Sequence, residues 1–181
     1  VEDPPDARHR VRELDPEGQL PRDERRELGE LVLVGDGPEK HTLSERARAL
    51  GMQGRVHFSG FQEDVSSAIH ALDVYVQPSL EEGLGTSILD ALQATRPVVA
   101  SRVGGIPEVI RENETGRLVP SGHPPALAKA IDALLDDPQA AQKLAEKGKQ
   151  RVSEQYSTEA LLTGNLELYD RLASAKRGSH R

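Results

Sequence analysis

Hydrophobic side chains gather in short runs from Leu31 onward, with longer mixed stretches between the runs. Val, Leu, Ala, Phe and Tyr dominate the runs at residues 31–34, 56–58, 73–76 and 98–100. Such short β-branched and aliphatic runs are typical of strands. Between them the apolar positions recur with helical spacing, which predicts helices over residues 38–50, 65–71 and 86–94.

The alternation of strand and helix continues toward the end of the chain. After Ser101, residues 104–110 predict a short helix and residues 116–120 a last small strand. Three amphipathic helices follow, each opening with Pro, Ser or Thr, over residues 124–137, 138–155 and 157–175. This order of elements predicts an α/β fold, here a Rossmann-like, doubly wound, mostly parallel sheet with helices on both faces.

Charge and proline content divide the chain into three parts. Residues 1–30 are rich in charged side chains and proline and poor in apolar ones, which predicts a flexible N-terminal arm. Residues 31–175 carry the strands and helices named above and are expected to form one globular domain. Residues 176–181 are expected to be a frayed tail.

Composition narrows the class of protein. Hydrophobic residues make up 36% of the chain and aromatic residues only 3%, so the core must be aliphatic. The absence of cysteine excludes disulfides, thiolate catalysis and Cys-ligated zinc. The net charge of -7 argues against a general nucleic-acid-binding protein, which needs a basic face. No run is apolar enough to span a bilayer and the N-terminus lacks a signal-peptide core, so we expect a cytoplasmic protein.

Small, loop-forming residues follow each of the first four predicted strands. They are Gly35-Asp36-Gly37-Pro38, Ser59-Gly60-Phe61, Gln77-Pro78-Ser79 and the segment 101–105. In an open parallel sheet such loops lie at the carboxyl edge, where folds of this class bind their ligands. The sequence therefore predicts a ligand site built from these loops.

The stretch at residues 78–110 carries the strongest signal. Its segment 81–86, with sequence EEGLGT, leads into a predicted helix. Two glycines let the backbone pass close to a ligand, and the helix N-terminus offers free N–H groups and a positive dipole end. This arrangement suits a phosphate or a sugar. The segment is not a P-loop, because no Gly-Lys-Ser/Thr follows, and its GxGxxG dinucleotide fingerprint is incomplete.

Two carboxylates sharpen the signal. Glu82 lies just before the predicted helix, and Asp90 lies eight residues later, inside it. Because helical side chains lean toward the N-terminus, we expect Asp90 to point back toward the edge where Glu82 lies. Acids near a helix N-terminus often only complement the dipole. Complementing the dipole explains Glu81 well. It explains Asp90 less well, because Asp90 lies deeper in the predicted helix beside apolar neighbours.

The same stretch resembles the signature of the GT-B retaining glycosyltransferases known as group 1 or family 4. The C-terminal, donor-binding domain of that family carries a stretch reading roughly P-S-x-x-E-G-x-G-x-x-x-x-E-A. Here the chain reads Pro78-Ser79-Leu80-Glu81-Glu82-Gly83-Leu84-Gly85, then Thr86 to Leu89, then Asp90-Ala91. The similarity extends to residues 35–38, 56–61, 97–101 and 104–108 and covers about residues 31–169. It implies one half of a GT-B fold.

The resemblance also implies a function, that of a hexosyltransferase-type enzyme. The donor would be a nucleotide-diphosphate sugar such as a UDP- or GDP-sugar, transferred with retention of configuration and without a cofactor or metal. Glu82 would be the catalytic residue facing the donor sugar, and Asp90 would accept hydrogen bonds from the ribose hydroxyls. A helix N-terminus would stabilise the leaving diphosphate. The implied donor-binding residues are Gly35, Gly37, Gly60, Phe61, Ser79, Glu82, Gly83, Leu84, Gly85, Thr86 and Asp90, with the segment 59–61 bordering the base.

Two positions depart from the family pattern, and one histidine has a separate expectation. Asp90 is one methylene shorter than the glutamate usual in the family. Thr95 lies where the family usually has a glycine that ends the helix, and a left-handed backbone there would strain a β-branched residue. His57, inside a strand, is expected to line the core or the cleft rather than to bind a metal. No D-x-D motif supports a metal-dependent GT-A alternative.

The acceptor-binding N-terminal domain of the family has no counterpart in this sequence, nor does the family's basic pair precede Leu31. We therefore expect the chain alone to be inactive and to need an acceptor-binding domain or subunit. Two alternatives stay open: a non-catalytic nucleotide-sugar-binding module acting in trans, and a GT-B-fold sugar-nucleotide epimerase. The segment 82–85, with an acid eight residues on, favours a transferase over an epimerase but does not separate a transferase from a module.

Overall fold

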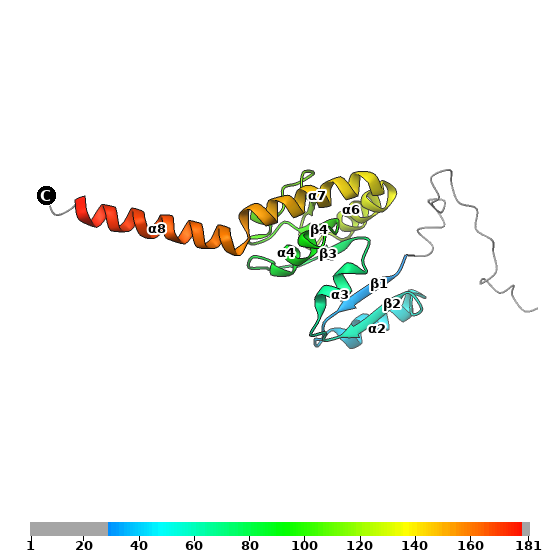
Figure 1. Ribbon diagram of the computed structural model, residues 1–181. Helices are drawn as coiled ribbons and strands as arrows, with labels where there is room; N and C mark the ends of the chain where they lie inside the picture. The colour runs from blue at the N-terminus through cyan, green and yellow to red at the C-terminus, as the bar shows by residue number, and fades with distance from the viewer. Residues whose placement is uncertain (1–28, 179–181) are drawn as a thin grey trace, which may run out of the picture. The chain divides into compact units, whose positions relative to one another are not determined.

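The computed structural model of the chain describes residues 29–178 (Figure 1). The predicted arm, apart from residues 29 and 30, and residues 179–181 of the predicted tail lie outside this range. The described residues form two compact units, which meet in sequence between Glu63 and Asp64. The single domain expected over residues 31–175 stays a prediction.

Unit 1 contains a strand–helix–strand motif. Strand β1 (Leu31–Val34), helix α2 (Lys40–Ala49) and strand β2 (Val56–Gly60) follow one another, and the two strands pair in parallel. Strand β2 is two residues longer than the run predicted at 56–58. It extends to Gly60, whose carbonyl accepts a hydrogen bond from the Gly35 amide at 2.8 Å.

Unit 2 contains a parallel three-stranded sheet in the order β3-β4-β5. Its strands are β3 (Tyr75–Gln77), β4 (Val98–Ser101) and β5 (Arg117–Val119). Its helices are α3 (Val65–His70), α4 (Thr86–Gln93), α5 (Ile106–Val109), α6 (Pro124–Asp136), α7 (Pro138–Gln155) and α8 (Thr158–Gly178). The prediction of an α/β fold with parallel strands and helices on both faces is therefore confirmed, in two sheets.

The central strand β4 organises the core of unit 2, because all four of its residues are buried. Successive strand residues face opposite sides of a sheet. Accordingly Val98 and Ala100 belong to one apolar cluster and Val99 to another. Ile88 and Leu92 of α4 lie in the first cluster, and Ala130 and Leu134 of α6 lie in the second.

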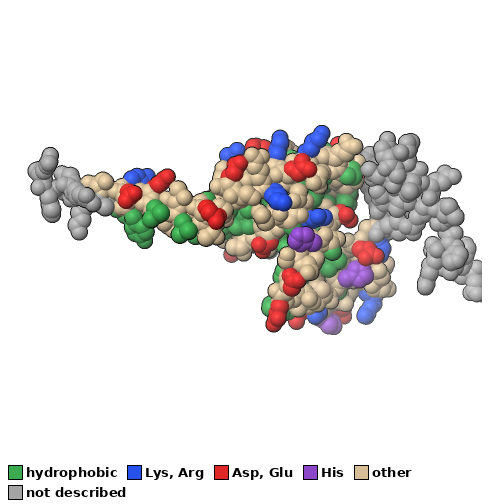
Figure 2. All heavy atoms as spheres, viewed as in Figure 1, with side chains coloured by type: hydrophobic (Ala, Val, Ile, Leu, Met, Phe, Trp, Pro, Cys, Tyr) green, Lys and Arg blue, Asp and Glu red, His purple; other side chains and the backbone are tan. Residues whose placement is uncertain are grey.

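Helix α8 is longer and less covered than the sequence indicates. It continues through Gly178, so residues 176–178 of the predicted tail are helical. Hydrophobic side chains gather along one side of it (Figure 2), at Leu161, Leu162, Leu166, Leu168, Tyr169 and Leu172, all of them exposed. No helix within residues 29–178 combines the length and the hydropathy needed to cross a membrane. The cytoplasmic location stays a prediction.

Candidate functional site

The end of β3 leads into a hydrogen-bonded cluster around Glu82. Gln77, the last residue of β3, donates from Nε2 to Ser79 Oγ at 3.0 Å and to Glu82 Oε2 at 3.1 Å. Ser79 Oγ donates to the same carboxylate oxygen at 3.1 Å, and the Gly83 amide donates to Glu82 Oε1 at 3.2 Å. Three donors thus hold a half-buried carboxylate at the carboxyl edge of the sheet.

Helix α4 begins directly after this cluster, at Gly85. Gly85 is buried and adopts a left-handed backbone with φ of 74°, which favours glycine. Asp64, His123 and Asp137 cap the N-termini of α3, α6 and α7 with side-chain acceptors, whereas no side chain caps α4. The Ile88 amide donates to the Gly85 carbonyl at 2.9 Å. The amides of Thr86 and Ser87 before it are therefore the ones available to an anionic group.

A second loop, after β4, lies against the backbone of this segment. The Gly105 amide donates to the Gly83 carbonyl at 2.6 Å. A Cβ atom added to Gly104 would lie 1.7 Å from the Glu82 carbonyl oxygen, and one added to Gly105 would lie 2.7 Å from that of Gly83. Only glycine fits at these two positions, so the pair at 104–105 supports the conformation of residues 82–83.

Asp90 lies on α4 with an exposed side chain, not one sheltered by apolar neighbours. Within residues 29–178 its side chain makes no hydrogen bond or ion pair, so its carboxylate oxygens are free to accept from a ligand. Burial raises the pKa of the Tyr75 phenol, the Ser87 hydroxyl opposes that rise, and the charges of Asp90 and Glu82 add to it. Both acids thus act on the Tyr75 phenol, and the expectation that Asp90 points toward Glu82 stays a prediction.

The loop after β5 also contacts the site, although it was not among the loops predicted to form it. Ser121 Oγ donates to the Ser79 carbonyl at 3.1 Å. A small cavity of about 120 Å³ lies beside this bond, with Pro78 and Ser101 among its lining residues. The signal was present in the sequence, because Pro120-Ser121-Gly122 follows its strand as the other loops follow theirs.

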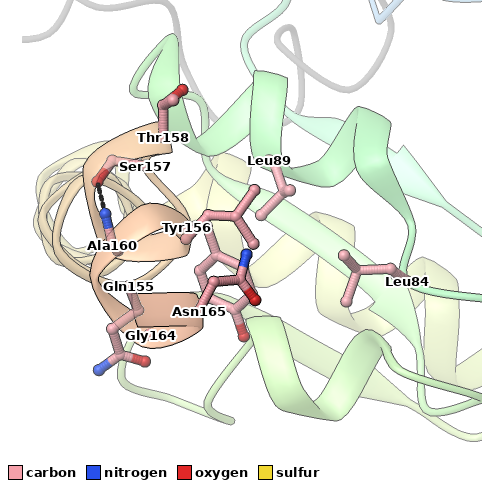
Figure 3. Close-up of a pocket in the computed structure, with 10 residues that line it drawn as sticks. Leu84, Leu89, Gln155, Tyr156, Ser157, Thr158, Ala160, Gly164 and Asn165 are labelled. Carbon is pink, nitrogen blue, oxygen red and sulfur yellow. Dashed lines mark hydrogen bonds between the residues drawn. The ribbon is translucent and has the colours of Figure 1, made fainter. Parts of the chain in front are cut away.

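A larger groove of about 400 Å³ lies between the start of α4 and the junction of α7 with α8 (Figure 3). Leu84 and Leu89 line one side of it and Tyr156 and Asn165 the other. Leu161 is also among its lining residues. Its lining contains no acidic or basic side chain. A diphosphate needs cationic or main-chain N–H partners, and the start of α4 beside Glu82 offers main-chain N–H groups, whereas the side chains of this groove offer no cation.

Four of the predicted donor-binding residues belong to unit 1. Gly35 and Gly60 meet through their backbones and both have positive φ, 126° and 68°. A Cβ added to Gly37 would meet nothing within 4 Å, so no contact requires glycine there. The side chain of Phe61 is 76% exposed. The roles of these four residues in donor binding stay predictions.

Two further expectations have clear outcomes. Thr95 has a left-handed backbone with φ of 56°, as the comparison with the family's glycine predicted. The expectation that His57 lines the core is wrong: its side chain is exposed, and Nε2 lies 3.2 Å from Glu30 Oε2. The reason is that strand residues alternate between faces, and His57 falls on the outer face, between the half-buried Val56 and Phe58.

A family model described as glycosyl transferases group 1 matches residues 19–151 of the chain. The chain belongs to this family. One relative is the lipopolysaccharide core biosynthesis glycosyltransferase LpsE of Rhizobium meliloti (strain 1021), 37% identical over 138 residues. The alignment covers 76% of this chain but only 41% of LpsE. The chain thus spans well under half the length of this relative.

Solved structures show the same relation. Anabaena Alr3699/HepE in complex with UDP matches with a TM-score of 0.72 and 28% identity, over 81% of this chain and 41% of that one. The same protein has also been solved with UDP-glucose. The C-terminal domain of the group 1 family protein LpcC from Francisella tularensis, 21% identical, matches in fold with a TM-score of 0.65. That match covers 76% of this chain and 92% of that domain.

Proposed function

We propose that this chain is the donor-binding part of a retaining glycosyltransferase and holds a nucleotide-diphosphate sugar at the start of α4. The observation that carries the proposal is the cluster around Glu82 beside a helix N-terminus without a side-chain cap. The complexes of Alr3699/HepE with UDP and UDP-glucose support this class of ligand. The retaining stereochemistry rests on the resemblance to family 4.

The chemistry follows from charge. Cleavage of the sugar–phosphate bond leaves negative charge on the diphosphate, and main-chain N–H groups at the start of α4 are preorganised to receive it. Glu82 has about four acceptor positions, of which three are occupied by Gln77, Ser79 and the Gly83 amide. The remaining capacity suits a hydroxyl of the donor sugar. No metal is needed for either task in this scheme.

Transfer also needs an acceptor, which we assign to a domain outside this chain. The share of LpsE that the chain covers, 41%, supports this assignment. The exposed apolar side of α8 supports it too, because contiguous apolar patches of this kind usually mark an interface. The alternative, a non-catalytic binding module acting in trans, would bind the same donor in the same way. The two hypotheses differ only in whether a partner that supplies the acceptor completes a transferase.

The test is a thermal-shift panel of UDP, GDP, ADP and TDP with their glucose conjugates. We expect one base to stabilise the chain, with the sugar conjugate binding at least as well as the diphosphate. Glu82→Ala should then weaken binding of the conjugate tenfold or more, from the roughly 1.5–3 kcal/mol of a hydrogen bond to a charged group. The neighbouring, exposed Glu81 supplies the matched control, and Glu81→Ala should change little. No stabilisation by any ligand of the panel would overturn the proposal.

A further inference from the structure

Gln77 links the interior of unit 2 to the carboxylate of Glu82. Its Oε1 accepts a hydrogen bond from the Tyr75 hydroxyl at 2.6 Å, and its Nε2 donates to Glu82 Oε2 at 3.1 Å. Tyr75 and Gln77 lie two residues apart on β3, and their side chains therefore share one face of the sheet. The family signature begins only at Pro78, so the resemblance says nothing about Gln77.

The partners of the amide determine its orientation. If the amide were rotated by half a turn, its oxygen would face the Glu82 carboxylate with no proton between them. Its nitrogen would then face the Tyr75 phenol, which can accept as well as donate, so the cost of the rotation lies at Glu82. Burial raises the pKa of Tyr75, so the phenol keeps its proton at neutral pH and stays a donor. Tyr75 therefore holds the Gln77 oxygen, which directs the Gln77 nitrogen to Glu82.

The consequence for Glu82 is a fixed carboxylate plane. Gln77 and Ser79 both donate to Oε2, while Oε1 meets only the Gly83 amide. Oε1 therefore keeps more of its acceptor capacity for a ligand than Oε2 does. A carboxylate held in this way presents one oxygen in one direction, which is the requirement for recognising a particular sugar hydroxyl.

We propose that Gln77 is a positioning residue that orients the Glu82 carboxylate toward the sugar of the donor. The inference rests on the proposed function and adds a residue to it. Gln77 itself has its polar atoms occupied by Tyr75, Ser79 and Glu82, so it acts through Glu82 rather than on the ligand. Its effect should therefore appear with the sugar and not with the nucleotide alone.

The experiment uses the 181-residue chain and titration calorimetry with UDP and UDP-glucose, or with the matching pair if the panel selects another base. Gln77→Leu should weaken UDP-glucose about fivefold and change UDP by less than about twofold, within the range of pairwise coupling energies. Retained UDP binding shows that the variant is folded. Gln77→Glu keeps the shape but replaces the donor with an acceptor, and it should weaken UDP-glucose at least as much.

Two controls make the result decisive. Gln93→Leu makes the same change at an exposed position of α4 and should affect neither ligand. In a Glu82→Ala background, Gln77→Leu should cause no further loss of UDP-glucose affinity, because its route to the ligand is gone. An equal loss for UDP and UDP-glucose, an additive loss in the Glu82→Ala background, or no loss at all would overturn the inference. Failure of the wild-type chain to bind any pair would instead overturn the proposed function.

Discussion

Thr95 follows the last turn of α4 in a backbone conformation that suits glycine better than threonine. Its φ of 56° lies in the left-handed region, where a β-branched side chain is strained. Thr95→Gly should therefore raise the free energy of unfolding by about 1 kcal/mol, measured by denaturant titration.

Asn113 provides the control for this substitution. It also has a left-handed backbone, with φ of 61°, but asparagine tolerates that region. Asn113→Gly should change the free energy of unfolding by less than Thr95→Gly does. A lower stability of the Thr95→Gly variant would show that packing of the half-buried threonine outweighs the backbone strain.

Asp90 should determine affinity for the nucleotide part of the donor. Hydrogen bonds from ribose hydroxyls to a charged acceptor contribute about 1.5–3 kcal/mol, so Asp90→Ala should weaken nucleoside-diphosphate binding tenfold or more. Asp90→Glu, which restores the family's usual acid, should preserve binding in titration calorimetry. Asp170→Ala, at an exposed position of α8, makes the same change in net charge and should have no effect. Unchanged affinity in the Asp90→Ala variant would remove Asp90 from the site.

At the scale of elements, helices α4 and α7 approach each other through Gly148. A Cβ added there would lie 2.5 Å from Leu92 Cδ2 and 3.0 Å from the Thr115 carbonyl oxygen. Gly148→Ala should therefore destabilise unit 2 by about 1–3 kcal/mol, because overpacking costs more than the gain in helix propensity.

Gly164 on α8 is the matched helical glycine. A Cβ added there meets nothing within 4 Å. Gly164→Ala should raise stability by about 0.5–1 kcal/mol, because alanine loses less backbone entropy than glycine in a helix. Both variants are compared by thermal unfolding. A similar change in both would contradict the close packing of α4 against α7.

At the scale of the whole molecule, we expect this chain to bind a sugar nucleotide without transferring the sugar. Holding two reactants in the right orientation supplies about 7–11 kcal/mol of a barrier reduction, and the acceptor face is assigned to a domain outside the chain. Addition of that domain in trans should restore transfer if the chain is an enzyme part. Transfer by the purified chain to a simple acceptor, well above the rate of hydrolysis, would contradict this expectation.

The salt dependence of binding tests whether main-chain amides, rather than basic side chains, hold the diphosphate. The net charge of -7 opposes an anionic ligand, so binding relies on local amides and the dipole of α4 rather than on a basic surface. Calorimetric affinity for the diphosphate should therefore be modest and weaken with added salt, but far less steeply than at a basic site. A steep loss of affinity would indicate basic side chains at the ligand.

The sequence by itself determined the order of elements, the parallel α/β class and the position of the candidate site. Strand and helix periodicity are local properties, and the runs at β1 and α7 match their predicted bounds. The spacing of Glu82 and Asp90 beside two glycines was likewise enough to select the start of α4. The left-handed backbone at Thr95 was also predicted, because the family usually has a glycine at this position. A glycine that ends a helix indicates a left-handed backbone, which is a local property.

Only the tertiary structure decided how that site is held together. The approach of Gly104 to the Glu82 carbonyl and the bond from Ser121 to Ser79 join segments far apart in the chain. The role of Gln77 depends on two contacts. Its side chain accepts from Tyr75 on the same face of β3, and the loop after β3 brings Glu82 within hydrogen-bond distance of it. No local pattern records these distances, because they follow from how the strands align in the sheet and how the loops after them fold back over its edge.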